Sequence, residues 1–361
     1  MKIGLYTIHA SHNVGAMLQA FALTKVLEKG GAEVELVNLY PIAEELQNHH
    51  STKGSFLHDL MRSIYLMLHP QIRTMERNFD KFHKQLPLSK RFYSSDEYIE
   101  NPLRYDLHLI GSDQVWNLQK GFDFSKFYFL DYLPADAKRV SYGASFGTCD
   151  DVKSLDEVAG ALRKFEKLSV REDRAVALVE SLVKKECTQV LDPTLLLSSN
   201  DWDEYISNDP IVKGQYIFFY GVNSDDTTWS IIKLAKEKLG LPVVGYPGPL
   251  RPQYPFDKFI LDGGPCEFVN LIKNATMVIT SSFHGLAFSV NYDKPFLLIN
   301  YSTRMERMES LVKLLKAQSH LVGSLADAER VLSEKHFSLA NNLSVQRQKS
   351  LTWIKENILE Q

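Results

Sequence analysis

The chain has 361 residues, 44% of them hydrophobic, and a formal net charge of −3 at pH 7. This length exceeds one ordinary domain and fits two, each with its own core. A nucleic-acid-binding protein is not indicated, because no basic excess is present to displace counterions from phosphates. No apolar stretch approaches a membrane span, the N-terminus lacks a signal-peptide pattern, and the three cysteines are widely spaced. We therefore expect a soluble, cytoplasmic protein with reduced thiols.

The first half of the chain alternates predicted strands and helices. Residues 2–8 predict a strand, a helix follows through residues 18–26, Gly30-Gly31 stops it, and residues 33–39 predict the next strand. Further strands are expected at 106–110, 139–145, 167–170 and 188–191. The alternation predicts a doubly wound α/β domain over residues 1–197.

Residues 42–100 interrupt this alternation and predict a helix-rich insertion. One of its helices separates two kinds of side chain: apolar Met75, Phe79, Phe82 and Leu86 on one face, and basic Arg73, Arg77, Lys81 and Lys84 on another. The pattern fits a helix that covers the sheet with a solvated basic face, or a surface that approaches anionic lipid. The sequence favours the covering helix.

The second half begins with residues 198–214, which are rich in Ser, Asn, Asp and Pro and predict a linker with at most a short helix in it. The alternation of strands and helices then restarts. Strands are expected at 216–222, 242–246, 277–280 and 295–299, and helices at 227–239, 266–273 and 284–292. We expect a second Rossmann-like domain over residues 215–340, facing the first across a cleft. The last residues, 341–361, predict a helix that packs back on the first domain.

Ligands of doubly wound sheets bind beyond the carboxyl ends of the strands, so the polar residues that follow each strand are the candidates. After the first strand, residues 9–15 lack the glycine pattern of a dinucleotide site. After the strand at 106–110, residues 111–117 place polar side chains beside Trp116. This composition fits a sugar site, and it equally fits a helix start capped by Ser112 or Asp113.

Three further strand ends in the first half carry notable residues. Residues 140–147 are small, which lets a ligand or another backbone come close. Arg171 would hold a carboxylate or phosphate, or would pair with the adjacent acids. Asp192, kept extended by Pro193, is interpreted as a turn residue first and a ligand contact second.

In the second half, Ser281-Ser282-Phe283-His284-Gly285 interrupts an apolar run. Ser281 or Ser282 would cap the next helix, and His284 would lie in its first turn. The amide groups and positive end of a helix form an anion site, and their field lowers the pKa of an imidazole, which would leave His284 neutral and able to exchange protons. Gly285 would permit a ligand to come close. The alternative is a buried histidine satisfied by neighbouring backbone.

Taken together, these stretches resemble the polysaccharide pyruvyl transferase family over nearly the whole chain. The matching segments are residues 13–23, 111–117, 141–147, 169–172, 191–196 and 281–285. The resemblance implies a GT-B-like fold of two Rossmann-type domains. It also implies transfer of a pyruvyl group from phosphoenolpyruvate to two hydroxyls of a sugar, with formation of a cyclic ketal and release of phosphate. The acceptor would be a cell-surface polysaccharide or its lipid-linked precursor.

The resemblance also assigns roles to residues. His284 would be the acid/base, and Arg171 would hold the carboxylate or phosphate of the donor, which makes both catalytic candidates. The expected donor contacts are Ser281, Ser282, Gly285, Arg304 and Arg307. The expected acceptor contacts are Asn13, Ser112, Asp113, Gln114 and Asn117.

One position departs from the family. Many members have an arginine two residues before the histidine, where this chain has Ser282. A serine carries no charge, so the donor anion must find a cation elsewhere or the donor must differ. Arg304 and Arg307 are the candidates for that cation, with a role as surface charges as the alternative.

Two other functions stay open at this point: a GT-B-type glycosyltransferase that uses a nucleotide sugar, and a non-catalytic glycan-binding protein with the same fold. No metal or cofactor is expected, because His49-His50 has no carboxylate or thiol at ligand spacing. Membrane contact would be at most peripheral, at the inner face of the cell membrane. The sequence does not determine the acceptor sugar, the ketal position or the oligomeric state.

Overall fold

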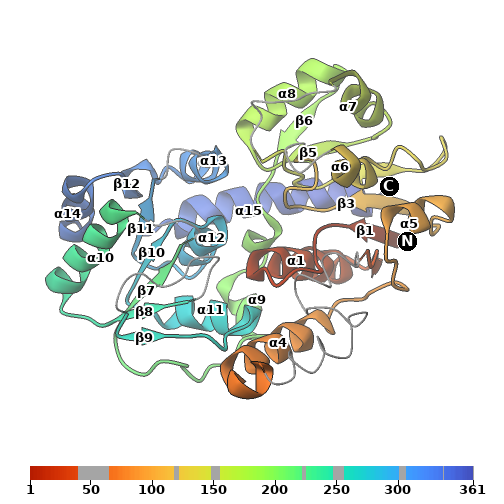
Figure 1. The fold of residues 1–361 in the computed structure, drawn as a ribbon. Coiled ribbons are helices and arrows are strands. Elements are labelled where there is room, and N and C mark those ends of the chain that lie inside the picture. The colour runs from red at the N-terminus through yellow and green to blue at the C-terminus, as the bar shows by residue number, and fades with distance from the viewer. Residues whose placement is uncertain are drawn as a thin grey trace. The chain divides into compact units, whose positions relative to one another are not determined.

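The computed structural model of the chain describes residues 1–39, 65–117, 122–147, 155–221, 225–246, 256–300, 306–335 and 337–360. The chain divides into two compact units: Met1–Leu196 with Gln348–Gln361, called unit 1, and Leu197–Arg347, called unit 2. Each unit is an α/β structure built on parallel strands (Figure 1). The predicted class of two Rossmann-like α/β units is confirmed.

Unit 1 contains a four-stranded parallel sheet in the order β2-β1-β3-β4. These strands are β2 (Glu33–Leu36), β1 (Lys2–Tyr6), β3 (Leu107–Ile110) and β4 (Arg139–Ser141). Single parallel bridges, Val140 to Lys167 and Ala144 to Val170, continue the sheet toward the pair β5 (Leu168–Val170) and β6 (Cys187–Gln189). The strand order reverses between β1 and β3, and the carboxyl ends of these two strands are where a sheet of this kind binds ligands.

Among the described residues of unit 1 the α-helices are α1 (Val14–Lys29), α4 (Pro70–His83), α5 (Ser95–Glu100), α6 (Phe122–Phe129), α7 (Leu155–Leu162), α8 (Asp173–Val183) and the end of α15 (Ala340–Ile354). A π-helical turn at Lys355–Leu359 follows α15. Helix α1 starts at Asn13, whose side-chain oxygen accepts hydrogen bonds from the Gly15 and Ala16 amides. Helix α4 packs on α1, since the Phe82 and Phe21 rings lie 5.1 Å apart. This contact supports the interpretation of α4 as a covering helix.

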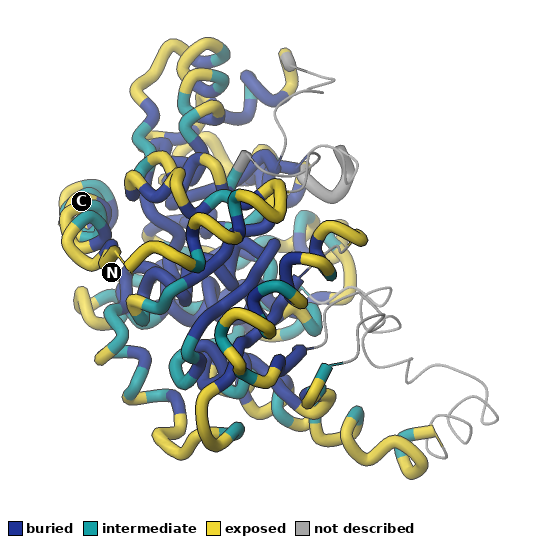
Figure 2. Tube along the Cα trace, turned by 90° about the vertical axis from the view of Figure 1, so that its left-hand side faces the viewer, coloured by how far each residue is buried: buried dark blue, intermediate teal, exposed yellow. Residues whose placement is uncertain are grey.

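Most predicted strands exist but are shorter than expected. The strand predicted at 139–145 ends at Ser141 because Gly143 adopts a left-handed backbone, with φ +62°, and turns the chain. The central strands β1, β3 and β4 are buried apart from Lys2, whereas the edge strand β2 is partly exposed; buried residues are dark blue in Figure 2. Near-continuous apolar strands of this kind are typical of parallel sheets covered on both faces.

Unit 2 contains a six-stranded parallel sheet in the order β12-β11-β10-β7-β8-β9. The strands are β7 (Ile217–Tyr220), β8 (Val243–Gly245), β9 (Lys258–Phe259), β10 (Met277–Thr280), β11 (Phe296–Ile299) and β12 (Leu321–Val322). The helices are α9 (Ser199–Asp203), α10 (Asp226–Leu239), α11 (Pro265–Asn274), α12 (Phe283–Asn291), α13 (Glu306–Leu315) and α14 (Leu325–Ser333). This is the Rossmann strand order, and it reverses between β7 and β10.

The segment predicted as a linker is packed into unit 2. Ser198 starts α9 with a reciprocal capping box to Asp201, and Trp202 lies buried with its ring 5.1 Å from that of Phe288. The Asn270 side chain donates hydrogen bonds to two carbonyls farther along the same segment. The boundary between the units lies at Leu196 and Leu197, so residues 198–214 belong to unit 2.

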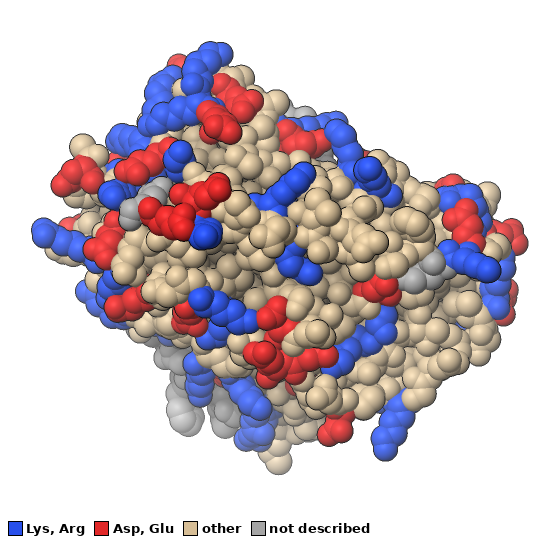
Figure 3. All heavy atoms as spheres, turned by 180° about the vertical axis from the view of Figure 1, so that it is seen from behind, with Lys and Arg blue, Asp and Glu red and all other residues tan. Residues whose placement is uncertain are grey.

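None of the helices that the structure describes is long and apolar enough to cross a membrane. On the face drawn in Figure 3, Lys and Arg side chains are interspersed with Asp and Glu side chains. That face carries no broad patch of a single charge.

Candidate active site

Unit 2 places the Ser281–Gly285 turn where the order of its strands reverses. Strand β10 ends at Thr280, which is paired with Tyr220 at the end of β7. The Thr280 hydroxyl donates to the Tyr220 carbonyl at 2.6 Å and accepts a hydrogen bond from the Ser282 amide at 3.0 Å. One hydroxyl therefore ties the end of β7 to the turn that leads into α12.

The histidine lies in the first turn of α12, as predicted. His284 is the second residue of the helix, it is 8% exposed, and its ring lies 5.2 Å from that of Phe283 in an edge-on contact. Ser282 occupies the N-cap position, but its hydroxyl makes no capping hydrogen bond. The prediction of a serine side-chain cap is therefore wrong for Ser282, since the Thr280 hydroxyl organises the turn instead.

The need for a glycine at position 285 is explained by a contact within the protein. A Cβ atom at this position would lie 2.2 Å from the Thr280 hydroxyl oxygen. The first turn of α12 thus packs directly on the end of β10, and the close neighbour of Gly285 is a side chain of the protein. The contact of Gly285 with the donor stays a prediction.

In unit 1, residues 111–117 follow β3 at the corresponding reversal point. No helix begins there, so the interpretation as a capped helix start is wrong. Asp113 instead adopts φ +79°, and its carbonyl accepts hydrogen bonds from the Val115 and Ser145 amides. A non-glycine residue in this region is strained, and such strain is concentrated at functional sites.

Trp116 does not provide a surface for a sugar. Its side chain is fully buried, its indole N–H donates to the Tyr128 carbonyl at 3.1 Å, and its ring stacks on Phe129 at 5.7 Å. The turn at Asp113 directs the indole into the core. The sugar-stacking interpretation of Trp116 is therefore wrong.

The other predicted acceptor contacts differ in accessibility. Ser112 is fully buried and bonds to the Gly143 carbonyl at 3.0 Å and to Asp192 at 3.2 Å, so it supports the loops and does not reach a ligand. Asn117 is buried and donates to the Gln114 side chain at 2.6 Å. Asp113 and Gln114 keep part of their surface exposed, while Asn13 caps α1.

Arg171 lies in a buried cluster of charges. The structure thus shows the ion pairing with acidic residues that the sequence left open as an alternative. Its guanidinium lies 2.5 Å from Asp192, 3.7 Å from Asp113 and 3.9 Å from Glu172. Burial alone would lower the pKa of Arg171, but the negative charges of Asp192, Glu172 and Asp113 outweigh burial and raise the pKa. The role of Arg171 as a holder of the donor anion stays a prediction.

The carboxylates of this cluster also hold the surrounding loops. Glu172 accepts a hydrogen bond from the Ser145 hydroxyl at 2.6 Å, and Asp192 accepts from the Thr194 amide and hydroxyl. Asp192 is therefore a turn residue, as interpreted from the sequence. Three carboxylates around one guanidinium favour groups that donate hydrogen bonds, such as sugar hydroxyls, over anions.

Sequence reasoning passed over His9, which follows β1 at the same reversal point. His9 is fully buried, and neither of its ring nitrogens has a hydrogen-bond partner among the residues that the structure describes. Burial, and secondly the neighbouring His83, lowers the pKa of His9 to about 3. The nearby Gln19 amide donates to Thr7, Ile8 and Ala16 and so fixes the loop. The sequence signal that could have identified His9 as a candidate was its position directly after the strand predicted at residues 2–8.

The structure describes only one of the two arginines proposed to replace the missing charge. Arg304 lies outside the described residues, as do His49, His50 and Cys149. Arg307 is half-buried in the first turn of α13. Both assignments stay predictions.

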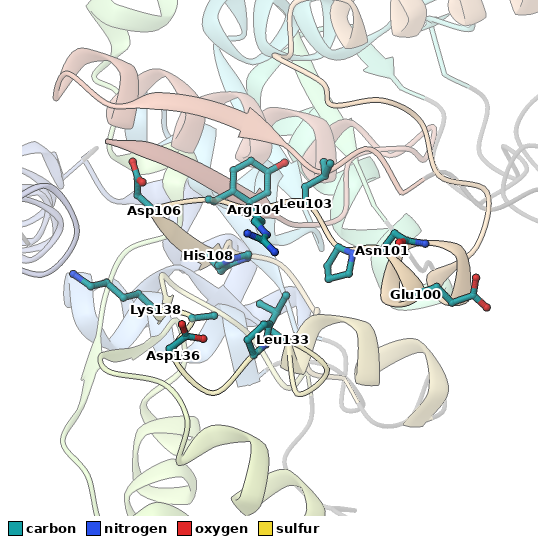
Figure 4. Close-up of a pocket in the computed structure, with 13 residues that line it drawn as sticks. Glu100, Asn101, Leu103, Arg104, Asp106, His108, Leu133, Asp136 and Lys138 are labelled. Carbon is teal, nitrogen blue, oxygen red and sulfur yellow. The ribbon is translucent and has the colours of Figure 1, made fainter.

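A hollow of about 800 Å³ lies at the opposite, amino-terminal edge of the unit 1 sheet. Figure 4 shows Arg104 pointing into it between His108 and Leu133. Its rim carries both signs of charge, among them Lys138 and Asp136. It lies away from the carboxyl ends of the strands, and none of the predicted site residues lines it.

Comparison with known proteins agrees with the fold and names a family. A UDP-N-acetylglucosamine 2-epimerase from Rickettsia bellii is 11% identical over all of both chains, with a TM-score of 0.53. The UDP-GlcNAc 2-epimerase from Neisseria meningitidis bound to UDP-GlcNAc is 12% identical over 98% of this chain and 100% of that one, with a TM-score of 0.52. A spinosyn rhamnosyltransferase is 12% identical over 100% of this chain and 99% of that one, with a TM-score of 0.50.

At this level of identity the structural matches show the fold alone, which is that of GT-B epimerases and glycosyltransferases. No curated protein matches the sequence. The family model for polysaccharide pyruvyl transferase matches residues 13–303, which include β3 with the loop after it and the Ser281–Gly285 turn. The chain therefore belongs to the polysaccharide pyruvyl transferase family.

Proposed function

We propose that the protein transfers the pyruvyl group of phosphoenolpyruvate to two hydroxyls of a saccharide, forming a cyclic ketal and releasing phosphate. Family membership supports a saccharide as the acceptor. The acceptor is proposed to be a cell-surface polysaccharide or its lipid-linked precursor. The observation that carries the proposal is the Ser281–Gly285 turn, which sets an imidazole in the first turn of a helix at the reversal point of unit 2.

The reaction requires proton transfers that a histidine performs near neutral pH. The methylene carbon of the donor takes a proton, the central carbon becomes cationic, and the first hydroxyl adds to it. The bond to phosphate then breaks, and the second hydroxyl adds. Of the two hydroxyl protons, one replaces the proton given to the methylene carbon and the other leaves with phosphate. His284 is proposed to give the first proton and to take one from a hydroxyl.

The two units offer different electrostatic environments for the two substrates. The N-terminus of α12 in unit 2 stabilises anionic groups through its dipole, which suits the donor. In unit 1, Asp113 is partly exposed and would accept a hydrogen bond from an acceptor hydroxyl. Arg171, held by Asp192, is proposed to position that carboxylate.

The test measures phosphate release from phosphoenolpyruvate with and without a panel of free and lipid-linked saccharides. We expect release to depend on the saccharide, and His284→Gln to lower it by about 10²–10⁴-fold. His320→Gln is the matched control, because His320 lies in the same unit and is also 8% exposed, with its ring stacked on Phe296. Equal activity of the two variants would contradict the role of His284.

A glycosyltransferase using a nucleotide sugar is the competing function, since a structural neighbour of the same fold was solved with UDP-GlcNAc. The two donors are separated by thermal unfolding in the presence of phosphoenolpyruvate or UDP-GlcNAc. A ligand present at 100 times its Kd stabilises the folded state by about 2.7 kcal/mol. Stabilisation by the nucleotide sugar alone would count against the proposal. If the protein is a non-catalytic glycan-binding protein, the wild type and the His284→Gln variant should bind saccharide equally well, and neither should release phosphate.

A further inference from the structure

The chain bears an exposed apolar cluster just before α4. Among the large hydrophobic residues that the structure describes, Met67 and Leu68 are the most exposed, at 80% and 70%, and Tyr65 is 47% exposed. Single exposed apolar side chains are common on protein surfaces, but three within four consecutive residues form a patch. Such a patch indicates a surface that contacts another apolar phase.

The apolar cluster is continuous with α4 through the backbone. The His69 amide donates to the Tyr65 carbonyl at 2.9 Å, and the Arg73 amide donates to the His69 carbonyl at 3.3 Å. Residues 65–68 therefore form a helical turn that a single residue separates from Pro70, the first residue of α4. His69, whose backbone is not helical (φ −123°, ψ 70°), joins this turn to α4, and we call residues 65–84 the α4 surface.

A row of four cations lies along the exposed side of α4. Arg73, Arg77, Lys81 and Lys84 are all exposed, and their spacing places them within an arc of about 80° at ~100° per residue. Among the residues that the structure describes, none forms an ion pair with these four cations. Glu76 and Asp80 lie at one flank of the row, so the α4 surface keeps a net positive charge.

The opposite face of α4 is already used by the protein. Phe79 and Phe82 are buried, and Phe82 packs on Phe21 of α1. An interfacial helix normally buries its apolar face in lipid. Here that face anchors α4 to unit 1, which leaves the row of cations toward solvent and leaves insertion to Met67 and Leu68.

We propose that the α4 surface binds an anionic lipid membrane, with Met67 and Leu68 entering the headgroup region and the four cations lying against lipid phosphates. Charge complementarity and the apolar cluster together favour this occupant. A soluble polyanion would satisfy the cations but would leave Met67 and Leu68 in water. The inference goes beyond the proposed function and does not rest on it.

The test is sedimentation of the full chain with vesicles of phosphatidylcholine alone or mixed with phosphatidylglycerol, without donor or acceptor. We expect binding to the anionic vesicles only, with a loss of binding as salt is raised. Each cation contributes about fivefold to partitioning. Arg73→Gln/Arg77→Gln is therefore expected to lower partitioning by about 25-fold, and Met67→Ser/Leu68→Ser by at least about tenfold.

The matched control is Lys233→Gln/Lys349→Gln, which removes the same charge from exposed positions outside α4. Its binding should equal that of the wild type. The proposal is overturned if neutral and anionic vesicles bind equally, if the control loses as much binding as the α4 variants, or if the Met67/Leu68 variant binds like the wild type. The last result would identify a purely ionic surface for soluble polyanions. Phosphate release from soluble substrates is measured separately, so failure here leaves the proposed function standing.

Discussion

Unit 1 is expected to lose stability in mild acid because it buries two neutral imidazoles. Burial and then His83 lower the pKa of His9 to about 3, and burial and then Arg139 lower the pKa of His108 to about 4. Both values lie below the ordinary value of about 6.5. Each group therefore stabilises the folded state fully above pH 6.5, and this contribution is lost as the pH falls toward the folded pKa.

The size of the effect follows from proton linkage. At pH values between the folded and unfolded pKa of an imidazole, only the unfolded chain binds the proton. The free energy of unfolding then falls by roughly 1.4 kcal/mol for each histidine and each pH unit of acidification. From pH 7 to pH 5 the loss is about 2 kcal/mol for each histidine. The two together should lower the free energy of unfolding of unit 1 by about 4 kcal/mol.

The assay is hydrogen exchange of the β1 and β3 amides in a urea series at pH 7 and pH 5, corrected for intrinsic exchange. His9→Phe should recover about half of the pH-dependent loss, since one of the two buried imidazoles is gone. The packing cost of the larger ring is present at both pH values and cancels in the difference. His69→Phe, at an exposed position, should leave the pH dependence unchanged. An unaltered pH dependence in His9→Phe would refute the reasoning.

Two further predictions concern charge at the strand ends. Arg171→Met leaves Asp113, Glu172 and Asp192 without their shared cation and should lower the stability of unit 1 by about 3–5 kcal/mol, measured by the same exchange method. Adding Asp192→Asn should recover part of that loss, and no recovery would count against the ion pair. Ser282→Arg restores the charge expected at this position and should raise the affinity for phosphoenolpyruvate at least about tenfold, read from ligand-dependent thermal unfolding. An unchanged affinity would show that the donor anion does not lie near Ser282.

Much of the fold could be predicted because the central parallel strands are mostly apolar and are separated by helices. Strand β10 was predicted at its observed residues, and His284 was placed correctly in the first turn of the following helix. The short helix allowed within residues 198–214 exists as α9, but the composition of this segment did not show that it packs into unit 2. The capping box at Ser198 and the burial of Trp202 became apparent only in the folded unit.

The sequence by itself determined the family, the α/β class and the position of His284, since each depends on residue order and local periodicity. The tertiary structure alone decided which polar residues reach a surface. Trp116 and Ser112 follow the same strand as Asp113, yet the left-handed backbone at Asp113 turns the indole into the core while Ser112 bonds to Gly143 and Asp192. Side-chain direction at a strand end depends on a single backbone angle and on partners distant in the chain, and neither is written in the local sequence.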